Sequence, residues 1–158
     1  MAGKYFESFE GLLRPDPVHR DANVTKFVNC IMKEGKRSLA QRIVYQAFDI
    51  LKQRVPDKEP LEVFTVAVEN VKPMVEVRSK RVGGANYQVP VEVNRKRARA
   101  LAYRWILESA REKKGKPLHR TLADELHAAF NREGGAMAKR DNTHKMAEAN
   151  KAFAHFAW

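Results

Sequence analysis

The sequence contains a single cysteine, Cys30, among its 158 residues. An internal disulfide is therefore impossible, and this cysteine usage fits a reducing compartment. Because Cys30 adjoins an apolar helical stripe, we expect it to pack as a small hydrophobic residue and not to act as a reactive thiol. A chain of this length can bury roughly 70% of its unfolded surface, so a core needs neither a disulfide nor a metal.

Long apolar runs are also missing, and no stretch has the length needed to span a bilayer. The N-terminal stretch MAGKYFESFEG lacks the apolar segment of a signal peptide and the Arg-rich composition of a transit peptide. We therefore expect a soluble cytoplasmic protein, with a plastid source left open.

Residues that could form a catalytic or metal site are few and scattered. Asp124 and Glu125 are adjacent and point to different helix faces, so they form no acid–base pair. No Lys-Ser or Lys-Thr follows Gly83-Gly84, as a phosphate-binding loop would require. The histidines show no metal-ligand spacing; they are His19, His119, His127, His144 and His155. The sequence predicts no enzyme, no cofactor, no metal and no small-molecule substrate.

Acidic residues are scarce in the middle of the chain. The whole sequence has 30 Lys and Arg against 19 Asp and Glu, a net charge of +11. From Lys72 to Arg120 there are fourteen basic residues against four acidic ones, whereas residues 1–71 hold eleven against ten and residues 121–158 five against five. A cluster of this kind favours a polyanionic partner, either nucleic acid or an anionic membrane surface.

Hydrophobic periodicity predicts a mainly α fold of six helices in a single domain, residues 1–158. The domain begins with an extended arm (1–20) and ends with a C-terminal helix and tail (135–158). Asp21 or Asn23 caps the first helix, and Gly35 ends it. The other helices span about 37–55, 60–72, 94–112 and 118–130, with the last one following Gly134-Gly135.

The period changes to two between the third and fourth helices, which predicts one protruding β-hairpin over 73–93. We expect the turn to span Lys80–Asn86, with the tip projecting and the base packed on the helices. One face of the hairpin is expected to be valine-rich and the other polar and basic.

Arginines at a spacing of seven continue the basic cluster into the fourth helix. Arg97, Arg104 and Arg111 fall on one helix stripe, about two turns apart. Solvated helix faces normally interleave Glu with Lys, whereas residues 94–120 hold ten basic residues and two acidic ones. A membrane-binding helix would need an exposed apolar face, and the apolar faces here are assigned to a core. The sequence thus favours a nucleic-acid-binding protein; an architectural DNA-binding protein and an RNA-processing enzyme are the alternatives.

Three stretches carry a family resemblance: KFVNCIMKEGKR (26–37) with Val44-Tyr45, ENVKPMVEVRSKRVGGANYQVPVEV (69–93) with Arg104-Trp105, and KMAEANKAFAH (145–155). With them, the chain resembles the bacterial form of small-subunit ribosomal protein seven over roughly residues 12–158. The sequence departs from that family's pattern in its weakly basic N-terminus, in Arg95 where a proline is common, and in its ending Phe156-Ala157-Trp158.

The resemblance implies a helical domain with a β-ribbon that binds the 3′ major domain of small-subunit rRNA and helps to nucleate head assembly. It also implies proximity to exit-site tRNA, to the mRNA exit channel and to ribosomal protein eleven. The rRNA contacts it implies are Lys36, Arg37, Arg78, Lys80, Arg81, Arg97 and Arg104. We add the cations Lys26, Arg95, Arg111, Lys113, Lys114 and Arg120. Near tRNA or mRNA we expect Arg81, Val82, Gly83 and Gly84, and near a protein partner or tRNA we expect Lys139, Arg140 and Lys145.

Overall fold

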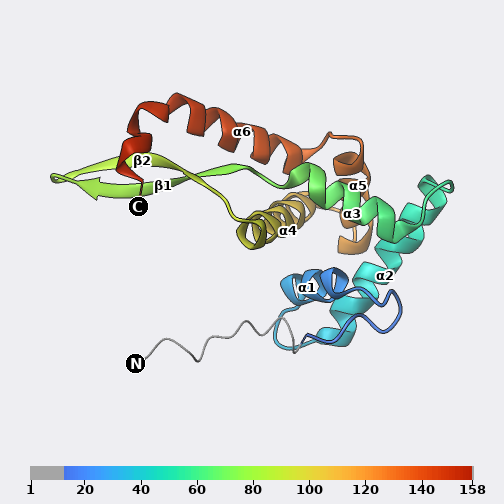
Figure 1. Cartoon of the computed structure of the whole chain (residues 1–158). Helices are drawn as coiled ribbons and strands as arrows, with labels where there is room; N and C mark the ends of the chain where they lie inside the picture. The colour runs from blue at the N-terminus through green and yellow to red at the C-terminus, as the bar shows by residue number, and fades with distance from the viewer. Residues whose placement is uncertain (1–12, 158) are drawn as a thin grey trace, which may run out of the picture.

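A computed structural model describes residues 13–157, and within them the chain forms six α-helices, a β-hairpin and a short 3₁₀ helix (Figure 1). The elements are α1 (Ala22–Ile31), α2 (Arg37–Arg54), α3 (Pro60–Val71), β1 (Val75–Val82), β2 (Ala85–Glu92), α4 (Arg95–Glu112), α5 (Leu118–Phe130), α6 (Gly135–Ala149) and η2 (Lys151–Phe156). The predicted mainly α fold, with its hairpin between the third and fourth helices, is confirmed. The 3₁₀ helix was not predicted, and most of the expected N-terminal arm lies outside the described residues.

Several helix ends follow the expected local signals. The side chain of Asp21 accepts hydrogen bonds from the backbone N–H groups of Asn23 and Val24, so Asp21 is the N-cap of α1. Asn94 caps α4 in the same way, accepting from the N–H of Arg97 at 2.9 Å. Pro60 occupies the first position of α3, where its missing N–H costs no hydrogen bond. Helix α1 ends at Ile31, earlier than its predicted end at Gly35.

The core lies between α1, α2, α3, α4 and α5, and its centre is aromatic. Phe64 of α3 contacts Phe27 of α1 and Phe48 of α2, with ring centroids 5.1 and 5.6 Å apart. Tyr103 of α4 closes the group, 5.3 Å from Phe27. Edge and tilted ring contacts of this kind add to the stability gained from burial alone. Helix α4 is thereby fixed on the helices that precede it in the chain.

The register of the hairpin contradicts the predicted valine-rich and polar faces. Gly83 and Gly84 form a two-residue turn, so Arg78 lies directly opposite Val89 and Val77 lies opposite Pro90. Residues directly opposite each other share a face, and Val77 and Val89 therefore lie on different faces. The prediction was wrong because it assumed the longer turn over Lys80–Asn86. Each face of the hairpin is instead mixed in polarity.

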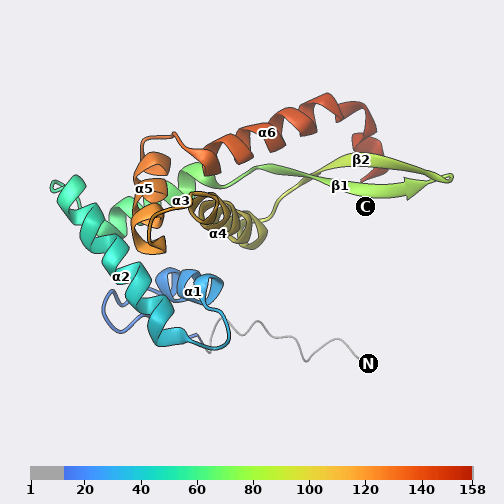
Figure 2. The same ribbon diagram turned by 180° about the vertical axis from the view of Figure 1, so that it is seen from behind.

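The C-terminal segment packs along the hairpin. Helix α6 runs beside it and η2 lies against its strands, while the tip extends beyond both (Figures 1 and 2). Tyr87 of β2 has its ring centroid 5.1 Å from those of Phe153 and Phe156. The Lys80 Nζ donates a hydrogen bond to the carbonyl of Phe156 at 2.6 Å. A two-stranded hairpin is marginal alone, so these contacts stabilise its orientation.

The start of α6 depends on a glycine at a close approach. Gly134 has φ +94° and ψ 178°, a conformation essentially restricted to glycine. A Cβ at Gly134 would lie 2.9 Å from both the Cβ of Ala128 and the Oε1 of Glu125. Glu125 is fully buried, and its Oε1 accepts a hydrogen bond from the N–H of Ala136 at 2.8 Å. This carboxylate and Gly134 together determine where α6 begins.

We predict that Gly134→Ala lowers the free energy of unfolding by roughly 2–5 kcal/mol, because backbone strain and the close contacts add. Gly115→Ala is the matched control, since Gly115 also has a positive φ (+83°) but a Cβ there would have no atom within 4 Å. It should cost only about 1–2 kcal/mol. Urea unfolding of both variants measures the difference. Equal losses would show that the contacts with Glu125 and Ala128 contribute nothing.

Candidate nucleic-acid interface

Helix α4 is the scaffold of the basic surface. Its apolar side is buried in the core through Leu101, Ala102, Ile106 and Ala110. Burial of that side fixes which way the helix faces, so its cations are confined to the remaining surface. Arg95, Arg104 and Arg111 are exposed, whereas Arg97 and Arg99 are half-buried. The predicted seven-residue stripe thus exists on the folded helix, with its members about 10.5 Å apart along the axis.

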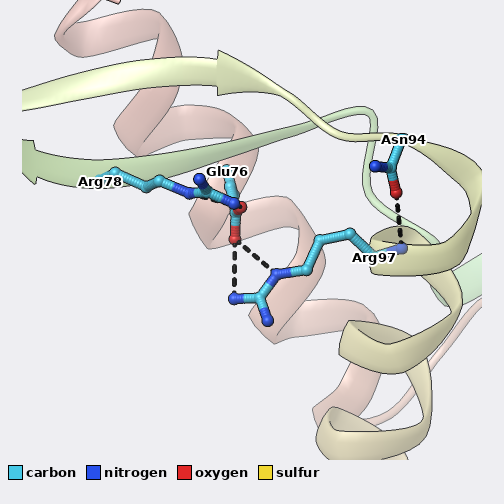
Figure 3. A network of polar contacts seen from close by, with 4 residues as sticks. All are labelled: Glu76, Arg78, Asn94 and Arg97. Carbon is cyan, nitrogen blue, oxygen red and sulfur yellow. Dashed lines mark hydrogen bonds and ion pairs between the residues drawn. The ribbon is translucent and has the colours of Figure 1, made fainter. Parts of the chain in front are cut away.

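The first stripe residue, Arg97, shares a buried carboxylate with the hairpin (Figure 3). Glu76 of β1 is 7% exposed. Its Oε2 accepts from the Nε and Nη2 of Arg97 at 3.2 and 3.1 Å, and its Oε1 accepts from the Nε of Arg78 at 2.8 Å. This three-residue cluster joins the hairpin to α4 and partly neutralises two of the predicted rRNA contacts.

The charge state of Glu76 follows from two opposing effects on its pKa. Desolvation, the largest single effect, raises the pKa of the carboxyl group. The hydrogen bonds and positive charges of Arg97 and Arg78 together outweigh it and hold the pKa below its ordinary value. Glu76 is therefore ionised at neutral pH, and the cluster carries a net charge of about +1.

The middle and end of α4 are tied to α1. The Nη1 of Arg99 donates to the Asn23 side chain at 3.1 Å, and the Tyr103 hydroxyl donates to the Asn23 carbonyl at 3.3 Å. Burial raises the pKa of Tyr103, so its hydroxyl stays protonated as a donor. At the other end, the Nη2 of Arg111 donates to the carbonyl of Ile31 at 3.3 Å. Helix α1 therefore lies beside the arginine stripe and forms part of the same surface.

Cys30 lies on this surface, and its expected packing as a small hydrophobic residue is wrong. The residue is exposed, because it falls next to the buried stripe of α1 and not within it. Neighbouring protein atoms desolvate the thiol and raise its pKa more than the charge of Arg104 lowers it. The thiolate is therefore disfavoured, and the expectation of an unreactive thiol stays a prediction.

The turn between α1 and α2 adds cations at the end of the stripe. Lys36 and Arg37, both predicted rRNA contacts, are exposed here. Glu34 and Gly35 both have positive φ, +54° and +71°, which reverses the chain within a short turn. The Lys36 Nζ lies 2.8 Å from the Glu34 carboxylate. Both side chains are exposed, so this ion pair adds little to the stability of the fold. Lys26, on α1, is half-buried.

Beyond α4, several predicted contacts are also used inside the protein. Lys113 forms an ion pair at 2.9 Å with the buried Glu125. Lys114 and Arg120 are exposed. Arg120 lines a polar recess with residues that the sequence reasoning did not select; they are Ile50, Gln53, Arg54, Lys116 and Asp124. The loop after α4 thus combines one structural lysine with a group of outward cations.

The hairpin tip is held in shape by its glycines. Gly83 and Gly84 have φ of +58° and +85°, as a two-residue hairpin turn with positive φ at both central positions requires. Arg81 is exposed and Val82 half-buried beside this turn. Lys80, which precedes Arg81 on β1 and lies further from the tip, donates a hydrogen bond to the carbonyl of Phe156. The tip therefore presents Arg81 outward on a rigid turn.

Two of the three cations expected near a protein partner or tRNA are engaged within the chain. Lys139 contacts Glu112 at 2.8 Å and Glu108 at 3.4 Å. Desolvation lowers the pKa of Lys139, but these carboxylates outweigh it and raise the pKa above its ordinary value. Arg140 donates to the Asn70 carbonyl at 2.5 Å and pairs with Asp141. Lys145 is exposed on α6.

Sequence reasoning missed Glu76 and Asn23, the two residues that orient the arginines of α4. Strand alternation assigned Glu76 to the polar, basic face of the hairpin. The Gly83-Gly84 pair was the available signal, because a two-glycine turn fixes the register and places Glu76 opposite Val91. No local signal existed for Asn23, whose partners Arg99 and Tyr103 are 76 and 80 residues away.

Other classes of site find no support in the described part of the chain. Within residues 13–157, no group of three or more His, Cys, Asp or Glu residues could hold a metal ion. None of the described helices has the length and apolar character needed to cross a membrane. What the described residues do present is a cationic surface on a helical scaffold, extended by a basic β-ribbon. This is the class of nucleic-acid-binding proteins that use a rigid scaffold to place cations against phosphates.

Comparison with known proteins specifies the family. The model of the family "Ribosomal protein S7p/S5e" matches residues 7–151. The chain is 57% identical over 144 residues to small ribosomal subunit protein uS7 of Thermotoga neapolitana, covering 91% of this chain and 92% of the relative. The proteins of the same name from Rhodopirellula baltica (56% over 144 residues; 90% and 92% covered) and Fervidobacterium nodosum (57% over 147 residues; 93% and 94% covered) are similar to it.

The chain belongs to the ribosomal protein S7p/S5e family. The suspected resemblance is confirmed, and with it the prediction that the protein is not an enzyme. Binding to rRNA is general for this family.

We predict that Glu76→Gln lowers the free energy of unfolding by about 1–2 kcal/mol at neutral pH, because Arg78 and Arg97 lose their shared counter-charge. The loss is smaller than for a fully buried pair, since both arginine side chains are more than a third exposed. The folded-state pKa of Glu76 is lowered, so its stabilising effect is present above the unfolded value near 4.5 and is lost as the pH falls through the folded value.

Glu92→Gln is the matched control, because Glu92 is exposed near the end of the neighbouring strand. It should change stability by less than about 0.5 kcal/mol. Urea unfolding at pH 7 and at successively lower pH measures both variants. A difference between wild type and Glu76→Gln that does not shrink on acidification would contradict the assigned role of the carboxylate.

Proposed function

We propose that this protein is a structural constituent of the small ribosomal subunit, located on cytoplasmic ribosomes. It binds the 3′ major domain of small-subunit rRNA and helps to nucleate assembly of the head. It lies near exit-site tRNA and the mRNA exit channel, with ribosomal protein eleven as a neighbour. Family membership supports the ribosomal part of this proposal, and the arrangement of cations supports the RNA-binding part.

The observation that carries the proposal is the connection of three basic regions through α4. The hairpin is joined to the first turn of α4 through Glu76, and the last residue of α1, which leads into the α1–α2 turn, is joined to the last turn of α4 through Arg111. The basic loop follows directly in sequence. Because each region is fixed to one rigid helix, their spacing is constant. A folded RNA junction with phosphates at matching positions is preferred over one that must deform.

The binding mechanism is electrostatic and geometric, without a catalytic step. Exposed cations such as Arg95, Arg104 and Lys114 neutralise phosphates and release counterions. Arg78 and Arg97 keep only part of their charge for RNA, because Glu76 is shared between them. They contribute chiefly by holding the hairpin at a fixed angle to the exposed cations.

A direct test is binding of the purified protein to a 3′ major-domain rRNA fragment, titrated with salt and challenged with excess duplex DNA. Tight binding that resists DNA and has a steep salt slope is the expected result. Equal competition by duplex DNA would favour the alternative of an architectural DNA-binding protein. RNA cleavage under multiple turnover would favour the alternative of an RNA-processing enzyme.

We predict that replacing Arg97, Arg104 and Arg111 together by Gln weakens binding to this fragment. The slope of log K against log salt should fall by up to about one unit per lost phosphate contact. The charge-matched control replaces three exposed cations outside the basic segment, Arg42, Lys52 and Arg132, and should leave the slope within about half a unit. An unchanged affinity and slope in the folded stripe variant would exclude the stripe as a phosphate-binding element.

We further predict that the hairpin tip acts chiefly on tRNA or mRNA and that Arg81 is not a primary rRNA anchor. A variant lacking Arg81, Val82, Ala85 and Asn86 keeps the glycine turn and makes Lys80 and Tyr87 the last cross-strand pair. The contact of Lys80 with Phe156 is retained. This variant should bind the rRNA fragment like wild type, while reconstituted subunits that contain it bind exit-site tRNA more weakly. A collapse of rRNA binding with the fold intact would identify the tip as a primary rRNA anchor.

A further inference from the structure

An apolar recess of about 320 Å³ lies where the ends of α1 and α4 meet the starts of α2 and α5. Its walls are aliphatic: Ile31, Met32, Leu39, Ala40, Ile43 and Leu118. Leu39 is 48% exposed, and it is one of only four large hydrophobic residues exposed within residues 13–157. The size is at the small end of ligand-binding sites, which span roughly 300–1,000 Å³. A single planar ring system fits this description better than a helix or a strand.

The rim of the recess is cationic. Lys33, Lys36 and Arg111 are exposed lining residues, and Glu34 is the one acidic residue among the lining residues. The charge of Glu34 is offset by Lys36 at 2.8 Å. Arg111 is oriented by its hydrogen bond to the Ile31 carbonyl, so its guanidinium plane is held at the wall. A planar guanidinium can stack on an aromatic ring and can also bind phosphate.

We propose that this recess receives one unstacked base of the bound RNA. Lys33, Lys36 and Arg111 contact the phosphates on either side of that nucleotide, and Leu39 packs against the base. The inference rests on the proposed rRNA binding and adds a base-recognition site to a surface otherwise suited to phosphates. Proteins that recognise RNA specifically bind unstacked bases against aromatic rings or guanidinium planes; here Arg111 supplies the guanidinium and the aliphatic walls take the place of an aromatic ring.

Charge complementarity favours a base over an apolar side chain from a neighbouring protein. A nucleotide brings its own anionic groups to the rim, one on each side of the ring. A protein side chain would leave Lys33 and Arg111 beside it without a matching anion unless acidic residues flanked it, since Lys36 already pairs with Glu34. The recess also lies at the end of the arginine stripe. Arg111 lines the recess, and Arg104, seven residues earlier on the same helix, is the preceding member of the stripe. An RNA strand that follows the stripe reaches the opening directly.

The test is an abasic scan of the 3′ major-domain fragment. Each unpaired nucleotide is replaced singly by an abasic one, and the affinity of wild-type protein and of Leu39→Asn is measured. At one position, removing the base should weaken wild-type binding about tenfold. Leu39→Asn should weaken binding to intact RNA by a similar factor, and the abasic change at that position should then have no further effect. The matched control is Met146→Gln, since Met146 is 52% exposed on α6; this variant should keep the tenfold abasic effect.

Each other outcome overturns the inference. Independent, multiplicative effects of Leu39→Asn and every abasic change would show that no base occupies the recess. A flat abasic scan with tight wild-type binding would reject the recess while leaving the proposed rRNA binding intact. If, in addition, Leu39→Asn bound RNA normally but entered subunits poorly, a protein side chain would be the occupant. Failure of wild type to bind intact RNA would reject both the recess and the proposed function. Urea unfolding checks that both variants are folded before their affinities are compared.

Discussion

The burial of one side of α4 is the constraint on which the rest of the molecule depends. Leu101, Ala102, Ile106 and Ala110 fix the rotation of this helix in the core. That rotation determines which arginines face out, where the hairpin attaches through Glu76 and where α1 lies through Asn23. A helix free to rotate by one residue, about 100°, would break both attachments and turn different arginines outward. The basic surface is therefore a consequence of core packing.

The cations divide between structural and outward roles, which charge counts alone do not distinguish. Lys113 is an ion-pair partner of the buried Glu125, and Lys139 joins α6 to α4 through Glu108 and Glu112. A buried carboxylate is costly unless paired, so Lys113 is committed to the fold, whereas the partners of Lys139 are exposed. Arg95, Arg104 and Lys114 are exposed. The charge available for phosphates is consequently smaller than the net charge of the middle segment, and it is concentrated on α4 and its two flanking turns.

The helices and their caps could be predicted from the sequence because their signals are local. Asp21, Asn94 and Pro60 act within a few residues of their positions. The faces of the hairpin were mispredicted because the register depends on turn length, and a change of one residue exchanges every face. The 3₁₀ helix at Lys151–Phe156 was missed since it packs through Tyr87, far away in sequence. The recess beside Leu39 combines four helices and the α1–α2 turn, so no single segment of the sequence encodes it.

The two ends of α4 face different tasks, and their construction differs accordingly. At its start, Arg97 donates hydrogen bonds to the buried carboxylate of Glu76. The hairpin is stabilised further by the packing of Phe153 and Phe156 on Tyr87. These contacts fix the orientation of the hairpin along its length. At its end, Arg111 has only a 3.3 Å bond to a carbonyl and borders an apolar recess with an open, cationic rim. Under the proposed RNA binding, that end is the one that accepts a nucleotide. Because α4 joins the two ends, RNA bound at the recess end, as proposed, would fix the position of the hairpin relative to the RNA without any change in the protein's fold.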